Sequence, residues 1–192
     1  MSSLTVQNIQ GSASSSNTIN VASGHKISGD ITHGSGSVFP AGHVLQVKHF
    51  NTGAVVNTSG STMPTDDTIL ESDEGTEFLS LSITPKSASS KLLIQIVLVG
   101  SANDGSRQIT AGLFQDSGSS AIASAATYML TGTGMTTLSF NHFMTAGTTS
   151  STTFKVRAGS NSGTYTLNGY NSSTRTQGGV AASSITIMEI AG

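Results

Sequence analysis

The sequence predicts an all-β protein, with an extended fibrous, stalk-like β segment followed by an antiparallel, jelly-roll-like β-sandwich head. Apolar residues recur at every second position in short stretches, and clusters of Gly, Ser, Asn, Asp and Pro separate these stretches. No window of helical length holds a convincing apolar period of about 3.6 residues. Many short strands with frequent turns are typical of a sandwich or jelly roll.

The N-terminal part, residues 1–43, contains only short apolar alternations between runs such as GSASSSN and HGSGS. Each is too thin to enclose a core, so we expect an attachment or stalk segment. The pattern of residues 23–27 (SGHKI) recurs at 41–45 (AGHVL). The recurrence indicates a repeated turn-and-strand unit of a fibrous β-structure, or a chance likeness in a chain rich in Gly and Ser.

The remaining residues, 44–192, form the predicted head domain. Turn-forming clusters such as SANDGS, QDSGSS and GSNSG divide it into short stretches of strand character. The expected strands are 44–50, 54–57, 68–70, 77–83, 91–99, 108–115, 122–127, 136–145, 152–158, 165–169 and 183–190.

Two of these stretches, 91–99 and 183–190, are apolar on both faces. A single sandwich buries one face of each strand, so the second face must be covered by another subunit or by a neighbouring segment of the same chain. Leu, Ile, Val and Phe make up only about 22% of the residues, which favours association over a marginal monomer. We expect self-association through a subunit interface that is lined by Leu93, Val97, Val99, Met188 and Ile190.

Composition excludes several classes of protein. Charged residues make up 9% of the chain and the net charge is −2, without the basic patch that nucleic-acid binding requires. There is no cysteine, and therefore no disulfide or thiolate chemistry. The start lacks the pattern of a signal peptide, and no apolar run reaches the ~20 residues that span a bilayer. We expect a protein made in the cytoplasm, without membrane insertion.

Enzyme motifs are absent from the sequence: it contains no P-loop, G-x-S-x-G elbow or H-E-x-x-H pattern. We expect no enzymatic activity, no cofactor and no metal site. Two clusters leave alternatives open. Six acids are either a solvated loop or a cation site: Asp66, Asp67, Glu71, Asp73, Glu74 and Glu77. Five histidines could each supply one ligand to a metal on a threefold axis, although core or interface packing fits His142 better: His25, His33, His43, His49 and His142.

Several phrases of the sequence, among them FPAGHVLQV, ITPKSASSKLLIQIVLVG and SSITIMEIAG, resemble short structural proteins of tailed bacteriophages, in particular marine ones. The resemblance implies a homotrimer with an N-terminal attachment or stalk segment. It also implies a jelly-roll-like head, similar in architecture to the complement and tumour-necrosis-factor trimers. It identifies no site residues.

These observations together predict a non-enzymatic phage virion protein, a trimeric tail fibre or tip that mediates host-surface attachment. The alternative is a capsid decoration protein or tail adaptor that acts in virion assembly, and a weaker one is an enzyme acting on surface glycans. The expected partners are copies of the chain, other tail or capsid proteins through the N-terminal segment, and a host glycan or protein. The candidate host-contact residues, chosen because aromatic and Arg side chains favour binding, are Tyr165, Tyr170 and Arg175.

Overall fold

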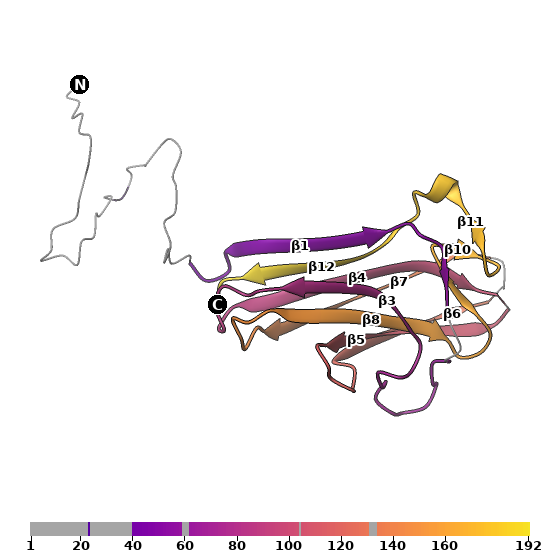
Figure 1. Cartoon of the computed structure of the whole chain (residues 1–192), viewed down its shortest axis with the longest axis horizontal. Coiled ribbons are helices and arrows are strands. Elements are labelled where there is room, and N and C mark those ends of the chain that lie inside the picture. Colours follow the sequence, from indigo (N-terminus) through magenta and orange to yellow (C-terminus); the bar gives the residue numbers. More distant parts are fainter. Residues whose placement is uncertain (1–22, 24–39, 59–61, 104, 131–133) are drawn as a thin grey trace, which may run out of the picture. The chain divides into compact units, whose positions relative to one another are not determined.

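The computed structural model describes residues 23, 40–58, 62–103, 105–130 and 134–192 (Figure 1). Its described strands pair antiparallel, so the all-β prediction is confirmed. The predicted stalk over residues 1–43 lies almost wholly outside the described residues and stays a prediction. In the described part of the chain no helix has the length and apolarity to cross a membrane.

The first sheet, called sheet I here, is built around the long central strand β4 (Lys91–Ala102). One edge of β4 pairs with β7 (Thr136–Thr145) along most of its length. The other edge pairs first with β12 (Ser183–Ile190) and then with β9 (Tyr165–Leu167). Beyond these lie β1 (Val44–Thr52), which pairs with β12, and the short β2 (Val56–Asn57), which pairs with β9.

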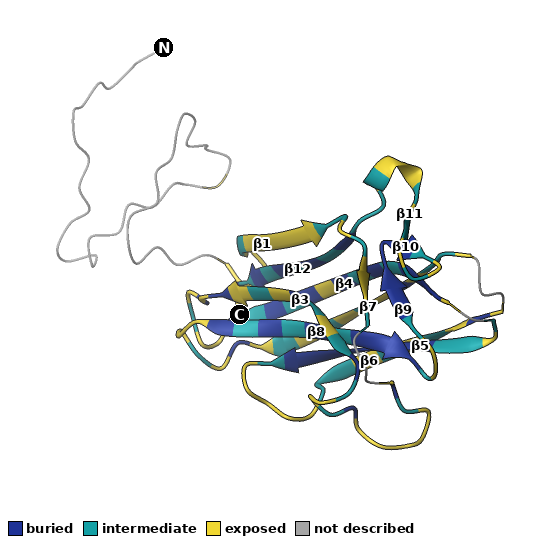
Figure 2. Cartoon of the chain, turned by 45° about the vertical axis from the view of Figure 1, so that its right-hand side comes forward, coloured by how far each residue is buried: buried dark blue, intermediate teal, exposed yellow. Residues whose placement is uncertain are grey.

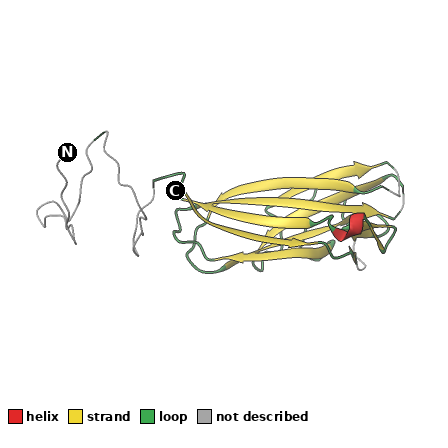
Figure 3. Ribbon diagram, turned by 90° about the horizontal axis from the view of Figure 1, so that it is seen from above, coloured by secondary structure: helices red, strands yellow, loops and turns green. Residues whose placement is uncertain are grey.

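The second sheet, sheet II, has the order β3-β8-β5-β6. Its strands are β3 (Thr76–Ile83), β8 (Thr152–Ser160), β5 (Arg107–Gln115) and β6 (Ala123–Met129). The strands of both sheets run along the long axis of the domain (Figure 3). A small hairpin of β10 (Gly169–Tyr170) and β11 (Thr174–Arg175), followed by the short helix η2 (Gln177–Gly179), lies at the end opposite the C-terminus.

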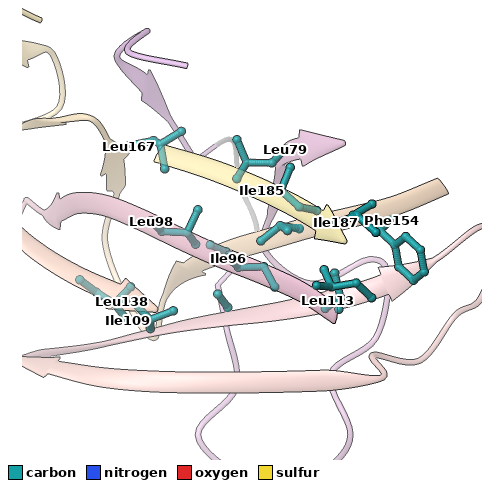
Figure 4. Packing of buried hydrophobic residues seen from close by; sticks show 14 of the residues in the cluster. Leu79, Ile96, Leu98, Ile109, Leu113, Leu138, Phe154, Leu167, Ile185 and Ile187 are labelled. Carbon is teal, nitrogen blue, oxygen red and sulfur yellow. The ribbon is translucent and has the colours of Figure 1, made fainter. Parts of the chain in front are cut away.

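The core lies between the two sheets (Figure 4). Alternate residues of β4 and β12 point inward, and their side chains are at most 1% exposed. Sheet II supplies the opposing layer. The core residues from both sheets that are labelled in Figure 4 are Leu79, Ile96, Leu98, Ile109, Leu113, Leu138, Phe154, Leu167, Ile185 and Ile187.

Most strands fall within a few residues of their predicted ranges, and the differences have local causes. The expected strand at 68–70 is a loop, because Leu70 turns inward to a small cluster instead of pairing along a sheet. The stretch 165–169 divides at Asn168, whose φ of 55° is left-handed and interrupts the strand. The two-residue strand β11 has no periodic signal in the sequence.

Part of the outer side of sheet II is covered by the chain itself. Phe114 on β5 is 2% exposed and packs in a second cluster with Met63 and Leu70, joined by the partly buried Ala121. The loop that carries Leu70 is held in place by an isolated bridge between Glu71 and Ser120. Part of the outer surface of sheet II is therefore core, and its cover comes from residues 62–75 and 116–121.

Candidate self-association surface

The outward side of sheet I carries a row of apolar side chains that crosses four strands. Val47 on β1 is opposite Met188 on β12, Met188 is opposite Leu93 on β4, and Leu93 is opposite Phe143 on β7. Directly opposed residues of neighbouring strands project to the same face. We call Val47, Met188, Leu93 and Phe143 the apolar row.

The ends of the apolar row are open to solvent. Val47 is 54% exposed and Phe143 is 57% exposed, while Leu93 and Met188 between them are partly buried. In Figure 2, buried and less buried residues alternate along β4, and β1 is largely exposed. In contrast to Phe114 on sheet II, Phe143 has no covering loop among the described residues. The outer sides of the two sheets thus differ, because loops cover Phe114 on sheet II and no described segment covers Phe143 on sheet I.

A second row, two residues further along each strand, is polar. Thr186 on β12 is opposite both His49 on β1 and Gln95 on β4, and Gln95 is opposite Asn141 on β7. His49 Nδ1 and the Thr186 hydroxyl lie 2.8 Å apart. We call His49, Thr186, Gln95 and Asn141 the polar row.

Formal charge is almost absent from this face. The outward residues beyond the polar row, toward the end of the sheet, are Asn51, Ser184, Val97, Ser139, Val99 and Thr137. At the other end Lys91 lies opposite Ile190 and donates a hydrogen bond to the Thr145 hydroxyl at 2.7 Å. A surface without Asp, Glu or Arg in its two central rows presents no like-charge repulsion to a copy of itself.

All five residues of the sequence-derived interface, listed at the end of this sentence, lie on strands of sheet I and are partly buried: Leu93, Val97, Val99, Met188 and Ile190. The structure adds Val47 and Phe143, which the sequence analysis did not select. Phe143 was detectable, since it is the one large apolar residue among the polar positions on that side of β7. Val47 was not, because a register irregularity between Val44 and Gln46 breaks the alternation of β1.

The three candidate contact residues do not form one surface group. Tyr165 is 1% exposed and packs edge-on against Phe78, with ring centroids 5.7 Å apart, and burial raises the pKa of its hydroxyl. Its selection as a surface contact was wrong, because β9 directs it into the core. Tyr170 and Arg175 lie on the β10–β11 hairpin, where Arg175 donates to the Gly178 carbonyl oxygen at 2.6 Å. Their role in binding stays a prediction.

The acidic cluster is dispersed along the loop that covers sheet II and the start of β3. Glu71 accepts a hydrogen bond from the Ser120 hydroxyl at 2.9 Å, and the Glu74 carboxylate accepts one from the Glu71 N–H at 2.8 Å. Hydrogen bonds from Thr68 hold the pKa of Asp66 below its ordinary value. Within the described ranges no three His, Asp or Glu side chains meet as a metal-binding group. His25 and His33 lie outside those ranges, and His142 is on β7, opposite Ile94.

Two packed antiparallel sheets, of which sheet II is partly covered on its outer side by loops and sheet I has no such cover among the described residues, define a jelly-roll-type β-sandwich domain. The family model Chlam_vir, described as the Pgp3 C-terminal domain, matches residues 46–192, and the chain belongs to this family. No curated protein matches the chain.

Among solved structures, Eiger TNF from S. frugiperda is similar with a TM-score of 0.40 and 12% identity, covering 76% of this chain and 92% of that one. The Gx strain of infectious bursal disease virus gives 0.40 and 14%, covering 85% of this chain and 38% of that one. Dimeric latent PorU from Porphyromonas gingivalis gives 0.35 and 9%, covering 83% and 14%. These likenesses are too distant to support an inference about this chain.

The family match corrects the assignment based on sequence phrases. The matching model is the Pgp3 C-terminal domain and not a phage tail-fibre family. The predictions of a tail fibre or tip, of a capsid decoration or tail adaptor protein, and of a location in the virion are therefore wrong. Tail and capsid proteins are likewise unsupported as partners. The described residues of the three quoted phrases lie in strands and turns, and segments of that kind reflect the fold and not the function.

Proposed function

We propose that this domain is a non-enzymatic binding domain that acts as a homotrimer, and that its copies associate through the outer face of sheet I. The observation that carries the proposal is the contrast between the two sheets. Sheet II buries Phe114 under its own loops, whereas sheet I leaves Phe143 and Val47 more than half exposed in a continuous row with Leu93 and Met188. The match to the Pgp3 C-terminal domain spans residues 46–192 and therefore includes all four residues of the apolar row.

The outer face of sheet I is too small to form a stable interface by itself. Four strands about 4.8 Å apart, each about eight residues long at 3.3 Å per residue, cover roughly 500 Å² in plan. A standard stable interface buries about 800 Å² on each partner. A neighbouring surface must therefore take part. The edge strand β1 offers Phe50, which is 40% exposed and opposite the inward-facing Ile185, so it projects on the other side of the sheet from the apolar row.

This arrangement favours a ring over a flat pair. Two copies packed face to face would cover the apolar rows and leave Phe50 in water. A contact between the face of one copy and the β1 edge of the next would cover both. Such a contact joins two different surfaces of the chain, and it closes into a ring of three when successive copies are related by a rotation of about 120°.

The test uses the full chain in light scattering and native mass spectrometry. The expected mass is three times 19.5 kDa. Phe143→Asp and Val47→Asp are expected to give the single-chain mass with unchanged strand content in circular dichroism, because both side chains are already exposed in one copy, and with a melting temperature lowered only by the loss of association. Tyr128→Asp is the matched control: Tyr128 is also 57% exposed but lies on sheet II, and the variant should remain trimeric. A wild-type chain of 19.5 kDa at tens of micromolar would refute the proposal.

A further inference from the structure

Asn168 is followed by Gly169, and this is the one Asn-Gly pair in the sequence. Such a pair is chemically labile, because a glycine without a side chain lets its backbone nitrogen reach the preceding side-chain amide. The pair lies between the end of β9 and the start of the β10–β11 hairpin, with both residues buried and Asn168 in a left-handed conformation. A reactive pair therefore lies inside the fold.

The reaction open to this pair is deamidation, and it consumes only water. The Gly169 nitrogen bonds to Cγ of Asn168 while the Cγ–Nδ2 bond breaks, and the proton of the Gly169 N–H leaves with Nδ2 as ammonia. Water then opens the cyclic imide, adding a hydroxyl to one carbonyl carbon and a proton to the nitrogen. The products are aspartate, or isoaspartate with one more carbon in the main chain. Both replace a neutral amide by a carboxylate that is charged near neutral pH.

The folded domain holds the amide of Asn168 in place. Its Nδ2 donates to the carbonyl oxygens of Thr52 and Ala54 at 2.8 and 3.0 Å, and its Oδ1 accepts from the Ser183 hydroxyl at 2.8 Å. The side chain is 1% exposed, so water hardly reaches it. A Cβ atom added to Gly169 would lie 2.7 Å from the nearest backbone oxygen, so the main chain is closely packed there as well. Attack by the Gly169 nitrogen requires this end of the sandwich to open.

The product of the reaction does not fit the same position. Nδ2 is the atom that faces the carbonyl oxygens of Thr52 and Ala54, and in a carboxylate an oxygen without a proton takes its place. Oxygen atoms would then face one another in a buried position, where a charge without a partner is strongly unfavourable. A chain that deamidates while it is open therefore cannot restore this network when it closes.

We propose that Asn168–Gly169 is a deamidation site that the folded domain protects and that opening of the β10–β11 end exposes, so that opening leads to irreversible loss of the native fold. Local opening needs less free energy than global unfolding and is therefore more frequent. The hairpin that begins at Gly169 has only two residues in each strand, and Asn171 and Ser173 in its turn are exposed. This end of the sandwich thus sets the lifetime of the domain.

The test follows deamidation of the full chain by peptide mass spectrometry, in the folded state and in urea, at one mildly alkaline pH and one temperature. Asn168 of the folded wild type should react at least about 100-fold more slowly than in urea. Ser183→Ala removes the hydroxyl donor and should raise the folded rate about 5- to 30-fold, with the rate in urea unchanged. Ser184→Ala is the matched control, because Ser184 is the next residue but is only partly buried, and it should behave as the wild type. Circular dichroism checks that each variant is folded.

Asn168→Asp tests the consequence, since it is one product of the reaction. At neutral pH it should unfold at a lower urea concentration than Asn168→Ala, or fail to fold where Asn168→Ala folds, because the carboxylate adds a charge among unpaired oxygens. Asn171→Asp, at an exposed left-handed position of the hairpin, should stay close to the wild type.

Four results would overturn the proposal. Equal rates in the folded and unfolded wild type would show that the fold gives no protection, and an unreactive Asn168 in urea would show that the pair is not labile. A folded Ser183→Ala that reacts as slowly as the wild type would remove the network as the source of protection. An Asn168→Asp variant at least as stable as Asn168→Ala would show that the product fits. None of these results bears on self-association, which is read from the mass of the assembly.

Discussion

The side chains of Asn168 and Ser183 join three strands at one end of the sandwich. The Ser183 hydroxyl donates to Asn168 Oδ1 at 2.8 Å and accepts the N–H of Val99 at 2.9 Å. Asn168 Nδ2 donates to the carbonyl oxygens of Thr52 and Ala54 at 2.8 and 3.0 Å. With Asn168 1% exposed and Ser183 fully buried, this network ties the end of β1 to β4 and to the start of β12.

Asn168→Ala should therefore lower the free energy of unfolding by about 2–4 kcal/mol, because it leaves several buried polar groups without partners. Asn171→Ala is the matched control. Asn171 also has a left-handed backbone, with φ of 51° against 55° for Asn168, but it is exposed. The backbone effect of the substitution is thus similar at both sites, and the difference between them in urea denaturation measures the network. Equal losses at both sites would show that the network contributes nothing.

The cover over sheet II depends on Leu70, which is 7% exposed beside Phe114, while the preceding Ile69 is 66% exposed. Leu70→Ala should lower the free energy of unfolding by about 2–4 kcal/mol through lost burial and a cavity. Ile69→Ala should change it by less than about 0.5 kcal/mol. Chemical denaturation of the two variants checks the pair, and similar values for both would contradict the assignment of this loop to the core.

Two tyrosines that the sequence analysis grouped together should behave differently. Tyr165→Ala removes a ring that is buried against Phe78 and should lower the free energy of unfolding by about 3–5 kcal/mol. Tyr170 is only partly buried, on the hairpin, and Tyr170→Ala should have a much smaller effect. Thermal melting followed by circular dichroism measures both. A Tyr165→Ala variant as stable as the wild type would mean that this ring is not part of the core.

Acid should destabilise the domain through Glu189. Burial by itself raises the pKa of this carboxyl, but hydrogen bonds to the carboxylate outweigh it and hold the pKa below its ordinary value. The donors include Gln46 Nε2 at 2.6 Å and the Lys86 N–H at 2.7 Å. A lowered pKa in the folded state means that the stabilisation is complete above the ordinary carboxyl pKa of about 4.3 and is lost as the pH falls toward the folded value.

Glu189→Gln should lower the unfolding free energy at pH 7 by about 1–3 kcal/mol, because one oxygen acceptor becomes an N–H₂ group that faces a donor. The gap between wild type and variant should narrow as the pH falls below about 4. Melting curves between pH 3 and pH 7 provide the measurement, with Glu77→Gln, an exposed carboxylate on β3, as the control. A gap that stays constant with pH would show that the charge of Glu189 is not the source of the stabilisation.

Much of the fold could be predicted from sequence because alternation is a local signal. β7 and β12 have the predicted bounds, and β4 begins at the predicted Lys91. The second apolar face of β4 was also visible, in the positions of Leu93 and Val97. What alternation could not show is which outer face the chain covers for itself. Leu70 looks like strand in the sequence, and only the path of its loop brings it onto Phe114.

The candidate surface was predicted in part for the same reason. Apolar residues of β4 and β12 could be selected one by one from the sequence. The row that joins Val47 to Phe143 depends on the order of four strands that are distant in the chain. Tyr165 was wrongly assigned to the surface, because a tyrosine beside a turn is compatible with either a surface or a core position.

The position of β12 between β1 and β4 sets the order in which the molecule can be made. β12 follows every other strand of the domain in the chain, yet it pairs with the first strand, as Val44 does with Ile190. Pairing of such distant segments is slow. Until β12 inserts, β1 has no neighbour in sheet I and the apolar row is interrupted at Met188. If copies associate through this face as proposed, each nascent chain must therefore complete its own sheet before it can join another.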